Sequence, residues 1–571
     1  MSGARRIRGW LAIVAIVAPV ALFARWSWYQ DGQGPAYLPS PDALEYAAAA
    51  QSIATDGTFL IQVAQHRVRP RYSPGWPLVQ AVALGAGVDG AALWRLTALL
   101  GAALACAIAG VTKTALEITF SSTTAGGASS EEPARRTALV AGIAAGLAWA
   151  LSPLAATSGG TAMSDEPTAL ACFVALAALG LALTRRDPGI GAARAATALA
   201  LGGGLAAGFA LTMRASRGCS GPALAGLALH AARRRGVRHV ARVVALAALG
   251  ALPPVLATMA VLARSGVSPW RWSAYEHWAP ERFGDLSVTF SWTYAWVANP
   301  HIPAYVDVSP VGQLRAYGLT FLGFAGPHNW MRFGTAWPLL GWAALGVLAV
   351  PPLARRVLGR AGSADPAGID ETGDRASRRG AGGADAPLAS LGVGAIAVAL
   401  WCVTHWLVFG AYFYPDPRFV LGALAWCPVA LAVGLGRLAI GGAHPRARSG
   451  AVLAASLVLA LLLGDAWAHH PKRRIYEPRN DETRAELHRF LAWDDATRAR
   501  ERVPFDTVLA QALGWFPASR AALVSSWGPP PAIKQANLLI RSGYLRADGT
   551  RNAAGASLGP ERPVLSTRED R

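Results

Sequence analysis

Two pairs of carboxylates stand where the sequence would begin a helix. Asp42 and Glu45 lie three residues apart before an alanine-rich segment, and Asp165 and Glu166 precede a long apolar run. A carboxylate beside an acceptor hydroxyl or amine can remove its proton as a general base, which typically accelerates a reaction by about 10²–10⁴-fold. The acids also have a structural interpretation, because Asp42 with Glu45 forms a capping box and the helix dipole favours acids in a first turn. Both interpretations stay open at this stage.

One tyrosine and several arginines accompany these acids and could bind an anionic substrate. Together with Glu45, the candidate binding residues are Tyr46, Arg67, Arg69, Arg71, Arg214 and Arg418. The guanidinium group of arginine matches the geometry of phosphate and carboxylate oxygens. Arg418 follows an aromatic turn at the start of an apolar run. The positive end of the helix dipole disfavours a cation there, so we expect an anionic partner.

The composition defines the class of protein that must position these residues. Of 571 residues, 53% are hydrophobic and 15% charged, the mean hydropathy is +0.31, and apolar runs of membrane-spanning length recur. The formal charge of +19 lies largely in short links between these runs, so it indicates membrane topology rather than nucleic-acid binding. The five cysteines have no paired spacing, which predicts neither a disulfide framework nor a metal site.

The apolar runs predict an all-α polytopic membrane protein with about 11 transmembrane helices. The first, at residues 10–24, is expected to be retained with a cytoplasmic N-terminus, because three arginines precede it. Further spans are expected near residues 91–116, 137–154, 167–183, 195–211, 221–229, 240–262, 338–353, 388–411, 419–438 and 452–467. Residues 76–87 are too few to cross roughly 30 Å at about 1.5 Å per residue, and predict a re-entrant or interfacial helix.

We expect residues 1–468 to form the membrane domain, with external segments at 25–75 and 263–337 that include juxtamembrane helices. A polar, glycine-rich stretch at 359–387 predicts a disordered cytoplasmic linker. An odd number of spans places residues 469–571 outside the membrane as a small soluble α/β domain. The same topology brings the candidate acids and the arginines near residues 67–71 and 418 to one side. This is the external or periplasmic face of the cell (inner) membrane.

In order and sidedness, these motifs resemble the GT-C glycosyltransferases. The likeness is to the branch of dolichyl-phosphate-mannose protein mannosyltransferases and bacterial lipid A aminoarabinose transferases, over roughly residues 10–470. The motifs are Pro41-Asp42-Ala-Leu-Glu45-Tyr46, Arg71-Tyr-Ser-Pro74-Gly75-Trp76-Pro77, Leu151-Ser-Pro153 with Asp165-Glu166, Leu211-Thr-Met-Arg214, and Pro415-Asp-Pro-Arg418-Phe419. The resemblance implies a membrane enzyme that moves a sugar from a polyprenyl-phosphate donor to a lipid, glycan or protein acceptor.

The resemblance also implies roles for the acids. Asp42 is expected to act on the acceptor as a base or orienting group. Asp165 or Glu166 is expected to assist with the acceptor or with a divalent cation, which is the one cofactor that the resemblance leaves open. The first external segment has no adjacent Asp-Glu pair, since Glu45 is displaced by about one helical turn, so metal dependence is undecided.

For the basic residues, the resemblance implies contacts with the lipid phosphate. Arg69 or Arg71 is the nearest match to the phosphate-binding residue, and Arg418 is a candidate for a second contact. Ser73 stands where a second proline is common, which leaves the phosphate ligand undecided. Two other functions remain open: a flippase or transporter of lipid-linked sugars, whose charges would line a pathway, and a non-catalytic membrane scaffold.

Overall fold

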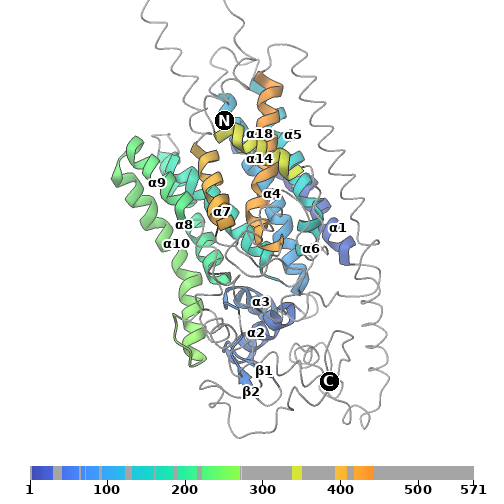
Figure 1. Cartoon of the computed structure of the whole chain (residues 1–571), viewed down its shortest axis with the longest axis vertical. Coiled ribbons are helices and arrows are strands. Elements are labelled where there is room, and N and C mark those ends of the chain that lie inside the picture. The colour runs from blue at the N-terminus through green and yellow to red at the C-terminus, as the bar shows by residue number, and fades with distance from the viewer. Residues whose placement is uncertain are drawn as a thin grey trace, which may run out of the picture.

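The structure, a computed structural model, describes residues 3–29, 42–63, 66–70, 72–88, 93–121, 131–159, 163–184, 190–214, 221–270, 272, 337–349, 393–407 and 417–441. A bundle of helices forms most of this part (Figure 1). Its helices are α1 (Gly3–Tyr29), α4 (Leu93–Ser121), α5 (Glu131–Ala150), α6 (Pro153–Gly159), α7 (Asp165–Thr184), α8 (Ile190–Met213), α9 (Gly221–Arg235), α10 (Val237–Arg264), α14 (Trp337–Ala349), α17 (Leu421–Leu424) and α18 (Trp426–Gly441), with a 3₁₀ turn, η6 (Pro417–Val420). A further apolar helix covers Val393–Leu407.

Five helices of the described part are long and apolar enough to cross a membrane. They are Ile7–Trp26, Leu93–Phe120, Asp165–Thr184, Ala193–Met213 and Val237–Arg264. Each coincides with a predicted span, so the multi-pass membrane character is confirmed. The total of about 11 spans stays a prediction, because residues 452–467 lie outside the described residues. The linker at 359–387, the domain at 469–571 and most of the segment at 263–337 also lie outside them.

Small residues let the membrane helices approach closely. A Cβ atom on Gly204 of α8 would lie 2.0 Å from the carbonyl oxygen of Ala247 on α10. Gly250 of α10 faces Leu201 in the same way, with 2.1 Å between such a Cβ and the carbonyl oxygen. Small residues at helix contacts are typical of membrane proteins, where apolar surface alone does not drive association. On its other side, α10 leaves large apolar side chains exposed, as a lipid-facing helix does: Val244, Leu249, Leu252 and Leu256.

A small juxtamembrane unit lies at one end of the bundle, which we call the α2 end (Figure 1). It consists of α2 (Asp42–Asp56), β1 (Ile61–Val63), β2 (His66–Val68) and α3 (Gly75–Gly85). The helix α2 ends before Gly57, whose φ of 68° suits glycine. The 11 residues of α3 span about 16 Å, which confirms that this helix is too short to cross. The end of α10 fixes the unit, because the Ser265 hydroxyl lies 2.6 Å from the Phe59 amide.

Several predicted boundaries or elements differ from the structure. The strands β1 and β2 pair antiparallel, with Gln62 opposite Arg67, and are absent from the all-α prediction. The span predicted at 137–154 divides into α5 and α6, because Pro153 cannot donate the amide that would continue α5. The span predicted at 419–438 divides into η6, α17 and α18, since Pro428 lacks the amide that would bond to the Leu424 carbonyl.

Candidate active site

The first turn of α7 is buried despite its polar sequence. Ser164, Asp165 and Glu166 have relative exposures of 0%, 1% and 0%. The hydroxyl of Thr168 donates a hydrogen bond to the Ser164 carbonyl, and the Thr168 amide lies 2.9 Å from the same oxygen. The helix start predicted at these acids is therefore confirmed.

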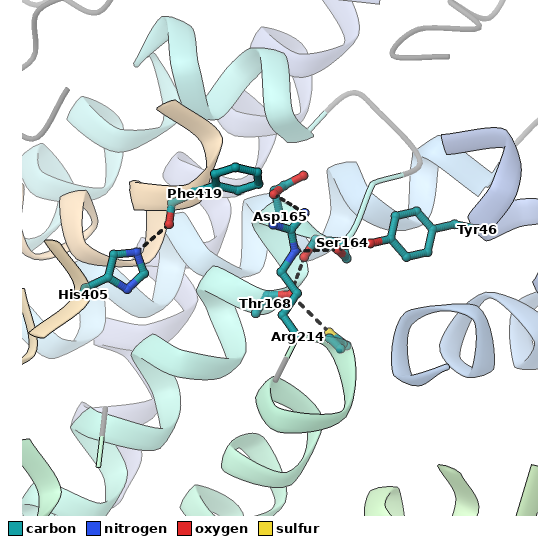
Figure 2. A network of polar contacts seen from close by, with 8 residues as sticks. Tyr46, Ser164, Asp165, Thr168, Arg214, His405 and Phe419 are labelled. Carbon is teal, nitrogen blue, oxygen red and sulfur yellow. Dashed lines mark hydrogen bonds and ion pairs between the residues drawn. The ribbon is translucent and has the colours of Figure 1, made fainter. Parts of the chain in front are cut away.

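Arg214, at the end of α8, lies beside Asp165 (Figure 2). Its Nη2 atom is 2.6 Å from Oδ1 of Asp165, and its Nε donates a 3.1 Å hydrogen bond to the Ser164 hydroxyl. The guanidinium also lies 5.1 Å from the centroid of the Phe419 ring, within the range of a cation–π contact. Within the described part of the chain, neither oxygen of Asp165 has a hydrogen bond of regular geometry. The ion pair with Arg214 therefore holds the Asp165 carboxylate, and its oxygens can still accept a hydrogen bond from another group.

Tyr46 connects this cluster to the juxtamembrane unit. Its hydroxyl lies 3.0 Å from the hydroxyl of Ser164, and its ring stacks on Tyr72 with 4.5 Å between the ring centroids. A buried apolar cluster surrounds the tyrosine, formed by Trp76, Met163 and Met213. The α2 helix is thereby fixed against the starts and ends of membrane helices. We call Tyr46, Ser164, Asp165 and Arg214 the polar cluster.

Glu166 faces a different partner. Its carboxylate forms an ion pair with Arg25 of α1, through Nη2 and through an Nε–Oε2 hydrogen bond of 3.2 Å. Nη1 of Arg25 donates to the Ala21 carbonyl at 3.0 Å, and both charged residues are 0% exposed. This pair could not be predicted, because its members lie 141 residues apart and Arg25 stands beside Trp26, at the edge of the first apolar run.

The remaining candidate residues are only partly described. Asp42 begins α2, and Arg67 lies in β2. Glu45 and Arg69 are buried, at 1% and 4% exposure, each with interacting partners. Arg418 is part of η6, next to Phe419. Arg71, together with the side chains of Asp42, Arg67 and Arg418, lies outside the described residues.

Of the candidate residues, the structure thus joins Tyr46, Asp165 and Arg214 in one polar cluster. Ser164, which bonds to two of the three, is absent from the candidates, although it occupies the position before the first turn of α7, where serine is favoured. No group of three or more His, Cys, Asp and Glu residues that could hold a metal occurs in the described ranges.

The fold and the cluster define a multi-pass helical membrane protein with a buried, charged site at one end of its bundle. No family model matches the chain, and no curated protein matches its sequence. Solved structures of an oligosaccharyltransferase and of ArnT are similar in fold to this chain, at low sequence identity.

One is the oligosaccharyltransferase AglB from Archaeoglobus fulgidus in complex with an inhibitory peptide and a dolichol-phosphate, at 12% identity and a TM-score of 0.49. The match covers 91% of this chain and 61% of that one. The other is ArnT from Cupriavidus metallidurans bound to undecaprenyl phosphate, at 16% identity and a TM-score of 0.44, covering 94% of this chain and 73% of that one. An oligosaccharyltransferase from Archaeoglobus fulgidus in complex with Zn and sulfate is similar at 13% identity and a TM-score of 0.47, and the match covers 90% of this chain and 59% of that one. At these values, the similarity assigns no role to any residue.

Proposed function

We propose that this chain is a membrane glycosyltransferase that moves a sugar from a polyprenyl-phosphate donor to a cell-envelope acceptor at its α2 end. The observation that carries the proposal is the Asp165 carboxylate, which is 1% exposed, is held by Arg214 and keeps lone pairs without hydrogen bonds in the described part. A buried acid of this kind can bind the hydroxyl or amine of an acceptor. The polyprenyl-phosphate donor is inferred from the order of the sequence motifs, which resembles that of the GT-C glycosyltransferases.

Asp42 is the proposed general base, with Asp165 orienting the acceptor. Asp42 starts α2 and precedes Tyr46 by four residues, which places the two on one helical face. Tyr46 in turn bonds to Ser164, the neighbour of Asp165. The Tyr46–Ser164 hydrogen bond therefore connects α2, which carries Asp42, to the start of α7, which carries Asp165.

Arginines supply the positive charge that the donor phosphate requires. Arg69 and Arg71 follow the β1–β2 pair that contains Arg67, and we assign the lipid phosphate to Arg69 or Arg71. Arg418 is the proposed second contact, because it precedes Phe419, whose ring lies beside the Arg214 guanidinium. Glu45 and Tyr46 are proposed to line the substrate site. Cations placed where charge develops on a leaving group stabilise the transition state.

The proposed reaction is a direct displacement with inversion. The acceptor oxygen or nitrogen gives its proton to the Asp42 carboxylate and forms a bond to the anomeric carbon of a hexosyl or pentosyl group. The bond from that carbon to the phosphate oxygen breaks, and the electron pair leaves with the polyprenyl phosphate. No acid partner is needed, unlike in glycoside hydrolysis, because the phosphate is a good leaving group.

The proposal includes a membrane orientation. The N-terminus and the linker at 359–387 face the cytoplasm, and the α2 end and residues 469–571 face the outside or periplasm. Arginines at the opposite end of the bundle agree with this orientation under the positive-inside rule, since α9 ends in Arg233, Arg234 and Arg235.

The test uses the purified full-length chain with a polyprenyl-phosphate sugar and cell-envelope acceptors, with product measured by mass spectrometry. Asp42→Asn and Asp165→Asn are expected to lower transfer by about 10²–10⁴-fold. Asp56→Asn, at the exposed other end of α2, is the matched control and is expected to keep wild-type transfer. Transfer that survives Asp42→Asn would defeat the assigned base. Movement of the sugar lipid across vesicles without transfer would favour a flippase.

A further inference from the structure

The two adjacent acids of α7 have arginine partners on different helices. Asp165 pairs with Arg214 at the end of α8, and Glu166 pairs with Arg25 near the end of α1. Successive side chains on an α-helix point about 100° apart, so the two carboxylates face different neighbouring helices.

The Glu166 carboxylate is enclosed on every described side. Two nitrogens of the Arg25 guanidinium contact its two oxygens, and both residues are 0% exposed. Glycines close the remaining space: a Cβ on Gly101 would lie 2.3 Å from Oε2 of Glu166, and one on Gly159 would lie 1.9 Å from the same atom. A substrate group has no room beside this carboxylate. Asp165, in contrast, contacts Arg214 through Oδ1 alone, and neither of its oxygens has a hydrogen bond of regular geometry in the described part of the chain.

We propose that Arg25 and Glu166 are a positioning pair. The pair fixes the first turn of α7 against α1 and thereby holds Asp165 toward Arg214, so that Asp165 is the one acid of the dipeptide that contacts the acceptor. The part that concerns the acceptor rests on the proposed glycosyltransferase function. The part that concerns geometry does not, and each part has its own experiment.

The first experiment measures the geometry by thermal unfolding of the purified full-length chain in detergent. In the wild-type background, Asp165→Asn removes the ion pair with Arg214 and is expected to lower Tm by several degrees. In the Arg25→Gln background, α7 is released, and we expect Asp165→Asn to shift Tm by less than half as much. Arg25→Lys keeps the charge but not the two-pronged contact, so an intermediate shift is expected, and this variant decides the question if Arg25→Gln does not fold. Equal shifts in all backgrounds would overturn the positioning role.

The second experiment separates positioning from catalysis by kinetics. Glu166→Gln leaves Arg25 buried without its counter-charge, so kcat should fall at least about tenfold while KM for the polyprenyl-phosphate sugar stays within about twofold. The double variant Arg25→Gln, Glu166→Gln restores charge balance and is expected to recover kcat to within about tenfold of wild type. A catalytic carboxylate could not be recovered in this way. A folded double variant with kcat as low as that of Asp165→Asn would show that Glu166 itself reacts.

The two experiments fail separately. If the wild-type chain transfers no sugar from any polyprenyl-phosphate donor, the proposed function fails, and the unfolding comparison still decides whether the pair positions α7. If transfer occurs but the unfolding shifts are equal, the positioning role fails and the proposed function stands.

Discussion

The hydroxyl of Tyr46 lies 3.0 Å from the hydroxyl of Ser164, and this contact joins a helix of the juxtamembrane unit to a membrane helix. Ser164 in turn accepts a hydrogen bond from Arg214 at 3.1 Å. Three elements that are distant in sequence, α2, α7 and α8, therefore meet at one serine side chain (Figure 2). If α2 carries the base, as proposed, this serine fixes the distance between the base and Asp165.

Tyr46→Phe is expected to test that connection. The change removes the hydroxyl but keeps the ring on Tyr72, so the loss should be about 1 kcal/mol of unfolding free energy. Transfer should fall more than stability suggests, by about tenfold, because small misplacements of a reacting group are costly. Thr55→Ala, in the same helix and with a local, exposed bond to the Gln51 carbonyl, is the control and should change neither measurement. Wild-type transfer by a folded Tyr46→Phe protein would contradict the connection.

Arg214→Lys is expected to be a severe change in spite of conserved charge. Lysine cannot contact Asp165 and Ser164 and at the same time lie flat beside the Phe419 ring. We expect transfer to fall by roughly 10–100-fold. Arg242, an exposed arginine of α10 that bonds to Thr197 at 3.4 Å, provides the matched control, and Arg242→Lys should retain full transfer. Equal rates of sugar transfer for Arg214→Lys and Arg242→Lys would exclude a specific role for the guanidinium group of Arg214.

Gly75→Ala should displace α3 from the membrane bundle. A Cβ at this position would lie 2.5 Å from the backbone carbonyl carbon of Thr212, and overpacking of this kind costs about 1–3 kcal/mol. Gly85→Ala in the same helix meets nothing within 4 Å and should be neutral or stabilising by up to about 1 kcal/mol, since alanine favours helix. Thermal unfolding of both variants in detergent compares them directly. A Gly75→Ala protein as stable as Gly85→Ala would show that α3 is not closely packed on α8.

His405→Ala is expected to destabilise the position of Phe419 beside Arg214. The buried His405 ring donates from Nε2 to the Phe419 carbonyl at 2.6 Å, and Phe419 lies beside Arg214. Loss of this buried hydrogen bond should cost about 1–3 kcal/mol, with a smaller decrease in transfer. Thr404→Ala removes an exposed hydroxyl that bonds to the Leu400 carbonyl one turn earlier in the same helix, and it should have little effect on unfolding. A similar stability for the two variants would argue against this role of His405.

The sequence predicted those parts of the fold that depend on local pattern. The membrane helices follow from uninterrupted apolar runs, and the start of α7 follows from an acidic first turn after a serine. The short α3 helix follows from length alone, because its residues are too few to cross a bilayer. The β1–β2 pair was missed, since strands of three residues are too short to establish an alternating pattern.

The site was predictable only where its residues are marked by neighbours in sequence. Tyr46, Asp165 and Arg214 lie in short motifs and were found, although their mutual contacts were not. Arg25 could not be found, because it resembles the basic residues that commonly flank a first membrane helix. Its function depends on Glu166, and that pairing is a property of the folded bundle rather than of any local segment.

The same pair has a consequence for how the protein is made. Arg25 is synthesised 141 residues before Glu166, so the first helix enters the bilayer while its arginine still lacks a counter-charge. Placement of that arginine at the end of α1 allows it to wait at the headgroup level, where a charge is tolerated. We expect the ion pair beside Gly101 and Gly159 to form only after α7 has been inserted, because that helix supplies the carboxylate. The final packing of α1 thus requires a segment that is synthesised later.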